Sequence, residues 1–141
     1  MKVRNSKPIL LVEDDRVDAM TLKRALNDQK VISPLVQVTN GEEAIEYLRN
    51  GGNQEPCLIL LDLNMPKMNG VEFLKIVKAD ETLKKIPIVV LTTSTEERDI
   101  AESFERGAAG YMVKSVDYEK FVEIVRAIDA YWSLSELPNR G

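Results

Sequence analysis

The stretch that decides the fold is "CLILLDLNMP", residues 57–66. Its first half is apolar at every position, without the alternation that a half-exposed strand shows. Such a run is typical of a strand inside a parallel sheet, with both of its faces covered. The run ends on a carboxylate, Asp62. A charged group at the end of a buried strand either caps a turn or takes part in chemistry, and the rest of the chain bears on that choice.

Short apolar runs alternate with amphipathic segments along the chain. Strands are expected at residues 9–12, 35–38, 58–61, 88–91 and 110–113. Helices are expected at residues 16–28, 40–50, from about 70, at 96–106 and from about 118. This strict alternation predicts an α/β fold, a doubly wound sheet of five parallel strands with helices on both faces.

Composition narrows the function classes. The chain has 141 residues, a formal net charge of −4, one cysteine and no histidine. The acidic balance, without a run of Lys or Arg, argues against a nucleic-acid partner. No apolar run reaches the roughly 18 to 20 residues of a membrane span, and no signal peptide is evident, so we expect a cytoplasmic protein. The absence of histidine excludes histidine-based catalysis, histidine metal ligands and a histidine phosphodonor on this chain.

Polar groups end four of the expected strands, and ligands of such sheets bind beyond the carboxyl ends of the strands. The residues at these ends are Glu13-Asp14-Asp15, Asp62, Thr92-Thr93-Ser94 and Lys114. Each has a structural alternative: Asp14 or Asp15 could cap the first helix, and Ser94 with Glu97 could form a capping box. Their convergence on one edge favours a functional site.

The chemistry of these groups points to a divalent cation and phosphate. Two carboxylates about 4 Å apart repel by roughly 4 kcal/mol at an effective dielectric constant near 20, so in a cluster of three either one carboxylate is protonated or a cation binds. Hard oxygen ligands in a shallow cleft suit Mg²⁺. With Thr92 and Lys114 completing the contacts to a phosphoryl group, Asp62 could be a nucleophile that becomes an acyl phosphate.

Four segments in this order resemble the receiver domain of two-component response regulators. They are "ILLVEDD" (9–15), "LILLDLNMPKMNG" (58–70), "IPIVVLTTS" (86–94) and "GAAGYMVKS" (107–115). The resemblance covers about residues 7–130 and implies the flavodoxin-like receiver fold. It also implies a phospho-accepting switch rather than an enzyme that turns over a separate substrate.

The resemblance assigns the metal site and the phosphoacceptor. It implies that Asp62 accepts the phosphoryl group from a phosphohistidine on a sensor histidine kinase. It implies that Glu13, Asp14 and Asp62 hold Mg²⁺, with the backbone carbonyl of Asn64 as a further ligand. Many members of the family have aspartate where this chain has Glu13.

The resemblance also assigns the residues that respond to phosphate. Thr92 would hydrogen-bond the phosphoryl group, Tyr111 would rotate inward behind Thr92, and Lys114 would pair with the phosphoryl oxygens. The family usually has proline after this lysine, commonly with a cis peptide bond, where this chain has Ser115. Because a non-proline cis bond costs about 3–4 kcal/mol, the loop is either trans and differently shaped or held cis under strain.

Few residues follow Lys114, so we expect no DNA-binding output domain and a signal read by a downstream protein from the surface of this domain. In the family that surface is formed by the fourth helix, fifth strand and fifth helix. Here Ile100 and Phe104 are expected to anchor the fourth helix.

We expect a receiver domain at residues 1–130 and a C-terminal extension at 131–141. The extension contains Trp132 and either folds back on the domain or forms a homodimer interface.

The aromatic C-terminus and "VKS" resemble the stand-alone regulators that pair with bacterial phytochrome-type kinases. Alternatives from other classes remain open at this point. A haloacid-dehalogenase-like phosphatase also uses a strand-end aspartate, but it needs an acid where this chain has Asn64. A flavodoxin-like nucleotide binder would meet repulsion from Glu13-Asp14-Asp15. A pseudo-receiver scaffold would not need the intact set of Asp62, Thr92 and Lys114.

Overall fold

The computed structural model describes residues 7–30, 34–65, 68–114, 119–120, 122–123 and 125–127. The elements in chain order are β1 (Ile9–Val12), α1 (Arg16–Asp28), β2 (Leu35–Val38), α2 (Gly41–Arg49), β3 (Leu58–Leu61), α3 (Gly70–Ala79), β4 (Ile88–Thr92), α4 (Glu97–Glu105) and β5 (Gly110–Val113). The described residues between 119 and 127 are helical, in the region of the expected last helix. The expected extension at 131–141 and the Lys114–Ser115 peptide lie outside the described residues.

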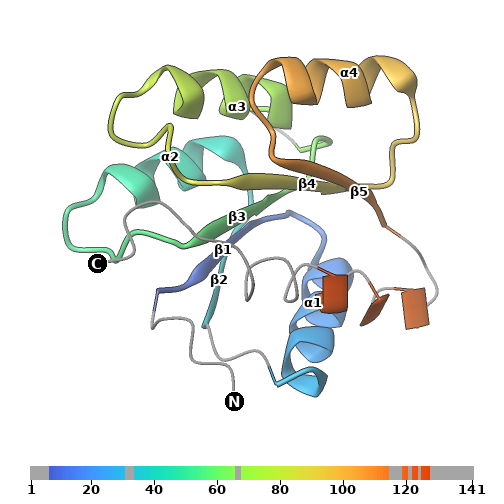
Figure 1. Ribbon diagram of the computed structural model, residues 1–141. Coiled ribbons are helices and arrows are strands. Elements are labelled where there is room, and N and C mark those ends of the chain that lie inside the picture. The colour runs from blue at the N-terminus through green and yellow to red at the C-terminus, as the bar shows by residue number, and fades with distance from the viewer. Residues whose placement is uncertain are drawn as a thin grey trace.

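The strands form one parallel sheet in the order β2-β1-β3-β4-β5. Val12 lies opposite Leu61 in the β1–β3 pair, and Leu61 lies opposite Val90 in the β3–β4 pair. The residues that follow β1 and β3, Glu13 and Asp62, therefore meet at the same edge of the sheet. The expected doubly wound α/β fold is confirmed (Figure 1).

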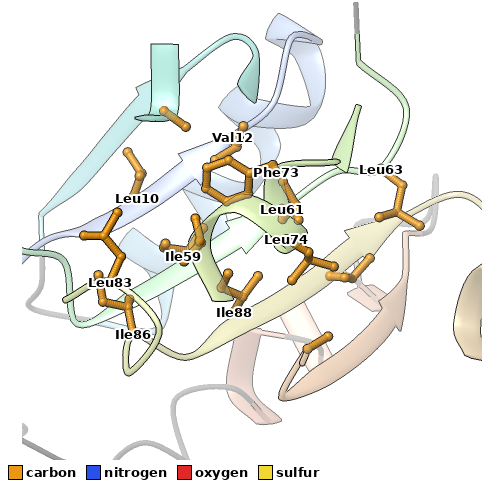
Figure 2. Packing of buried hydrophobic residues seen from close by; sticks show 14 of the residues in the cluster. Leu10, Val12, Ile59, Leu61, Leu63, Phe73, Leu74, Leu83, Ile86 and Ile88 are labelled. Atoms are coloured by element: carbon orange, nitrogen blue, oxygen red, sulfur yellow. The ribbon is translucent and has the colours of Figure 1, made fainter. Parts of the chain in front are cut away.

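Helices cover both faces of the sheet, with α2, α3 and α4 on one side and α1 on the other (Figure 1). The first side packs Phe73, Leu74 and Val77 of α3 against alternate strand residues such as Leu10, Ile59 and Ile88 (Figure 2). The remaining strand residues, among them Ile9, Leu11, Leu58 and Leu60, pack against Leu22 and Leu26 of α1. Because neighbouring strand residues enter opposite cores, the central strands β1 and β3 are apolar at every position, whereas β2 at the edge of the sheet carries the exposed Gln37. No helix among the described residues is long and apolar enough to cross a bilayer.

Side-chain caps set where α1 and α3 begin. Asp15 caps α1, and its Oδ1 accepts from the backbone N–H groups of Val17 and Asp18 at 2.9 and 3.1 Å. The capping role considered for the acids after β1 thus belongs to Asp15. At α3, Asn69 and Glu72 form a reciprocal capping box. These caps satisfy N–H groups that have no partner within the helix.

The start of α4 differs from the sequence expectation. The helix begins at Glu97 with Glu96 as its N-cap residue, so the capping box between Ser94 and Glu97 is wrong. The Ser94 hydroxyl instead donates to Asp99 Oδ2 at 2.6 Å and accepts from the Glu96 N–H at 3.3 Å. Ser94 therefore links the loop before α4 to the side chain of Asp99 in the first turn, without capping the helix.

The packing of α4 also needs correction. Phe104 is 48% exposed and Ile100 is half-buried, so the expectation that Phe104 anchors the helix is wrong. The buried residue of α4 is Ser103, which lies three positions after Ile100. Residues three apart lie on one helix face, and the face that meets the rest of the domain therefore carries a serine. Among the described residues, Ser103 Oγ has no hydrogen-bond partner.

Candidate functional site

A cluster of carboxylates lies at the carboxyl edge of the sheet. Glu13 and Asp14 follow β1, Asp62 follows β3, and one carboxylate oxygen from each lies within 4.8 Å of the others. Glu13 and Asp62 are buried and Asp14 is exposed. The Asp62 N–H donates to Val12 O at 3.1 Å, which ties the start of one loop to the end of the neighbouring strand. The expected gathering of these three acids is thus present in the structure.

The ammonium group of Lys114 lies inside this cluster. Its Nζ is 2.6 Å from Glu13 Oε1, 2.8 Å from Asp18 Oδ2 and 3.2 Å from Asp62 Oδ2. The side chain is only 5% exposed. β5 brings Lys114 to this point, and its N–H donates to Thr92 O at 2.7 Å. Although Ser115 replaces the usual proline, Lys114 points at the carboxylate of Asp62.

Burial and the contacts between Glu13 and Lys114 have opposite effects on the pKa values of these two residues. Burial raises the pKa of Glu13 to about 7, helped by the charge of Asp62 and opposed by the hydrogen bond from Lys114. Burial alone would lower the pKa of Lys114, but hydrogen bonds to Asp18 and Glu13 and the nearby charges raise it above its usual value. Lys114 is therefore a permanent cation among several acids.

The donor set fits a divalent cation. One ammonium faces three carboxylates, and Asp14 adds a fourth acid at the exposed side of the cluster. Carboxylate oxygens at this spacing are hard ligands, which Mg²⁺ and Mn²⁺ prefer. Lys114 Nζ already makes the contacts of a cation to Glu13 and Asp62, which shows that positive charge is stabilised between them.

Thr92 and Tyr111 are connected through Ser94 rather than to each other directly. Thr92, the last residue of β4, is fully buried, and its Oγ1 accepts from the Ser94 N–H at 3.5 Å. The half-buried Tyr111 of β5 donates its hydroxyl to Ser94 O at 3.0 Å. A displacement of Thr92 would therefore reach the loop before α4 by way of Ser94.

Short contacts hold the described residues just after Asp62 close to the start of α3. The Asn64 N–H donates to Asp62 Oδ1 at 3.2 Å, and the Gly70 N–H donates to Leu63 O at 3.0 Å. A Cβ atom on Gly70 would lie 2.7 Å from Leu63 Cα and 2.9 Å from Asp62 O. Glycine is thus required for α3 to start this close to Asp62. The role of the Asn64 carbonyl as a metal ligand stays a prediction.

The sequence pattern predicts Asp18 only as a residue of the first helix. Its contact to Lys114 joins residues 96 positions apart, and no local periodicity indicates such a pair. One feature of the sequence could have indicated the pair. Asp18 is an acid three positions after the helix-capping Asp15, in the first turn of the helix that follows the acidic strand end.

Comparison with known proteins identifies the class. The family model for the response regulator receiver domain matches residues 9–126, so the chain belongs to this family. It is thus a receiver of the kind that acts in phosphorylation-based two-component signalling, with histidine kinases as partners. This membership favours a signalling switch over the phosphatase and the scaffold considered from the sequence.

Among the similar proteins, three are informative. The chain is 41% identical to the phosphorylated cyanobacterial phytochrome response regulator RcpA, with a TM-score of 0.89 over 96% of this chain and 100% of that chain. The Mn²⁺-bound form of the response regulator Rcp1 gives 36% identity and a TM-score of 0.86 over 94% and 99%. Rcp1 is from Synechocystis sp., and its curated sequence is 38% identical over 89% of this chain and 88% of that protein. The probable methanogenesis regulatory protein FilR2 of Methanothrix harundinacea is 37% identical over 88% and 82%.

Proposed function

We propose that Asp62 accepts a phosphoryl group from the phosphohistidine of a sensor histidine kinase, in a reaction that requires Mg²⁺. The observation that carries the proposal is the convergence of Asp62 with two further acids and the ammonium group of Lys114. Glu13, Asp14 and Asp62 would hold the ion, together with the backbone carbonyl of Asn64. The relative Rcp1 has a Mn²⁺-bound form, which supports the binding of a divalent ion by this chain.

The transfer is a displacement at phosphorus. A carboxylate oxygen of Asp62 donates an electron pair to phosphorus, and a new O–P bond forms. The P–N bond of the phosphohistidine breaks, and its electron pair returns to the imidazole nitrogen of the kinase. When bound, the ion supplies charge that offsets the negative carboxylates and phosphoryl oxygens. Lys114 donates a charge-assisted hydrogen bond to a phosphoryl oxygen, and the Thr92 hydroxyl donates to another.

The product is proposed to act as a signal rather than as an intermediate of catalytic turnover. Two positions after Asp62, the phosphatase alternative needs a carboxyl group to move a proton, and the Asn64 amide cannot do this. Thr92 moving towards the phosphoryl group would disturb Ser94, to which Tyr111 also bonds. The proposed readout is therefore a change at the face formed by α4, β5 and the last helix, recognised by a downstream protein.

The partner kinase is proposed to be of the phytochrome type, because RcpA and Rcp1 are regulators of similar length and fold, and RcpA is described as a phytochrome response regulator. We further propose that the receiver domain spans residues 1–130, and that residues 131–141 contribute to a homodimer. A cytoplasmic location is part of this proposal, since one cysteine allows no disulfide within the chain.

Phosphotransfer from autophosphorylated candidate kinases tests the proposal. Wild type, Asp62→Asn and the matched control Asp28→Asn, at an exposed position of α1, are incubated with labelled kinase in Mg²⁺ or with a chelator. Label is expected on wild type and on the control, and only with the metal present. Label on Asp62→Asn at the wild-type rate would refute the assignment.

A further inference from the structure

We propose that Asp18 is a positioning residue for Lys114, which holds the lysine ammonium beside Asp62 while the phosphoryl group is taken up. The inference rests on the proposed function and deepens it. It begins from the 2.8 Å contact between Asp18 Oδ2 and Lys114 Nζ, which links the first turn of α1 to the end of β5.

The local structure of α1 leaves the Asp18 carboxylate available for this contact. Asp18 is the third residue after the N-cap, the position at which an acid commonly closes a capping box. In α3 the equivalent residue, Glu72, does so by accepting from the Asn69 N–H. In α1 the N–H of the capping Asp15 instead donates to Glu13 Oε2 at 3.1 Å. Asp18 is therefore not needed by the cap, and its oxygen faces Lys114.

The three acids around Lys114 differ in what else they can bind. Glu13 and Asp62 belong to the carboxylate cluster that fits a divalent cation, and Asp18 does not belong to it. When a cation binds Glu13 and Asp62 and a phosphoryl group is attached to Asp62, both of these acids are engaged by other groups. Of the acids in described contact with Lys114, Asp18 is then the one that has no other ligand to bind. It can then keep the ammonium at the site while the other two contacts are exchanged.

Burial supports this role. The Lys114 side chain is 5% exposed, whereas that of Asp18 is 32% exposed. Asp18 thus lies at the solvent-exposed side of the cluster, on a helix, and holds a lysine that follows β5, an edge strand of the sheet. A hydrogen bond between charged partners is shorter and stronger than a neutral one, and here it fixes the direction of the donor.

The test is the rate of Asp62 phosphorylation by acetyl phosphate, which needs no kinase surface, at saturating Mg²⁺. Asp18→Asn is expected to lower the maximal rate about five-fold, which equals about 1 kcal/mol of barrier at 1.36 kcal/mol per tenfold change. The Mg²⁺ concentration for half-maximal rate is expected to stay unchanged, because Asp18 is not a ligand. Asp18→Glu, which retains the charge, is expected to recover much of the rate.

Two comparisons separate this role from a structural one. Asp28→Asn removes the same charge from the other end of α1 and is expected to leave the rate unchanged. In a Lys114→Met background, Asp18→Asn is expected to have no further effect, because the group that it positions is gone. Thermal unfolding reports separately on the stabilisation that any acid gives to a first helical turn.

The inference would be overturned by a wild-type rate in Asp18→Asn or by an equal loss of rate in Asp18→Glu. It would also be overturned if Asp18→Asn needed more Mg²⁺ for its half-maximal rate, or if it lowered the rate as much in the Lys114→Met background as in wild type. Failure of the proposed function looks different. In that case wild type takes up no phosphate from acetyl phosphate, or Asp62→Asn takes it up as well.

Discussion

Gly70 is the residue whose size limits how closely α3 approaches the loop that carries Asp62. The atoms that a side chain here would meet are mainly backbone atoms of Leu63 and Asp62, which cannot move without moving the phosphoacceptor. Lys114 is constrained in a different way, by charge, since three carboxylates hold its ammonium. The geometry of the site thus depends on the small size of Gly70 and on the ion pairs of Lys114.

Gly70→Ala is expected to lower the free energy of unfolding by about 1–3 kcal/mol, because the new methyl group overlaps the Leu63 backbone. It is also expected to slow phosphorylation by displacing Asp62. Urea denaturation and labelling with acetyl phosphate measure the two effects. Gly51→Ala is the control, since a Cβ atom there meets no atom within 4 Å. Equal stability of the two variants would contradict this account of Gly70.

Asp80, just after α3, gives a pH-dependent prediction. The backbone N–H groups of Leu83 and Thr82 donate to its carboxylate and hold its pKa below the ordinary value. The charged form therefore stabilises the fold above the unfolded pKa of about 3.9, and this contribution is lost as the pH falls through the folded pKa. Asp80→Asn is expected to be less stable than wild type at neutral pH and to converge with it in acid.

Urea denaturation between neutral and acid pH measures this convergence, with Glu81→Gln as a control at an exposed neighbouring position. A difference between Asp80→Asn and wild type that stays constant across the pH range would show that the carboxylate charge is not the cause.

At the scale of elements, the strands were predictable from sequence and the packing of α4 was not. Apolar runs bounded by turn residues gave four of the strands their observed bounds, and β4 ends one residue later than expected, at Thr92. In α4 the apolar residues Ile100 and Phe104 suggested the buried face, yet the rest of the domain covers Ser103. A sequence pattern ranks residues by hydrophobicity and cannot reveal that a polar one is buried.

Ser103→Ala is expected to raise the free energy of unfolding by about 1 kcal/mol, because it removes a buried hydroxyl without a partner and favours the helix. Chemical denaturation measures the change, and Glu105→Ala at an exposed position of α4 is the control for a substitution by alanine in this helix that removes no buried hydroxyl. Destabilisation by Ser103→Ala would mean that the hydroxyl is hydrogen-bonded in solution.

At the scale of the whole molecule, parallel sheet order explains why the site could be foreseen. Strand ends that are distant in the chain meet at one edge, so the acids after β1 and β3 and the lysine after β5 were expected together. The direction of each side chain was not predictable. The Asp18–Lys114 pair depends on the position of the first turn of α1 relative to the end of β5, which no motif encodes.

Self-association is the prediction that belongs to the whole chain. The full-length protein is expected to be a dimer by light scattering, and a chain that ends at residue 130 is expected to be a folded monomer. The physical reason is the aromatic and apolar character of the C-terminal segment, which favours an interface. A full-length monomer, both with and without phosphorylation, would count against this prediction.

The central claim is that Asp62 becomes an acyl phosphate with the help of a divalent ion held by its neighbouring acids. The most direct measurement is to treat the protein with acetyl phosphate, reduce it with borohydride and locate the product by peptide mass spectrometry. Reduction converts an aspartyl phosphate to homoserine. We predict homoserine at position 62 when Mg²⁺ is present and none when it is chelated. Homoserine at another position, or at position 62 regardless of the metal, would contradict the account.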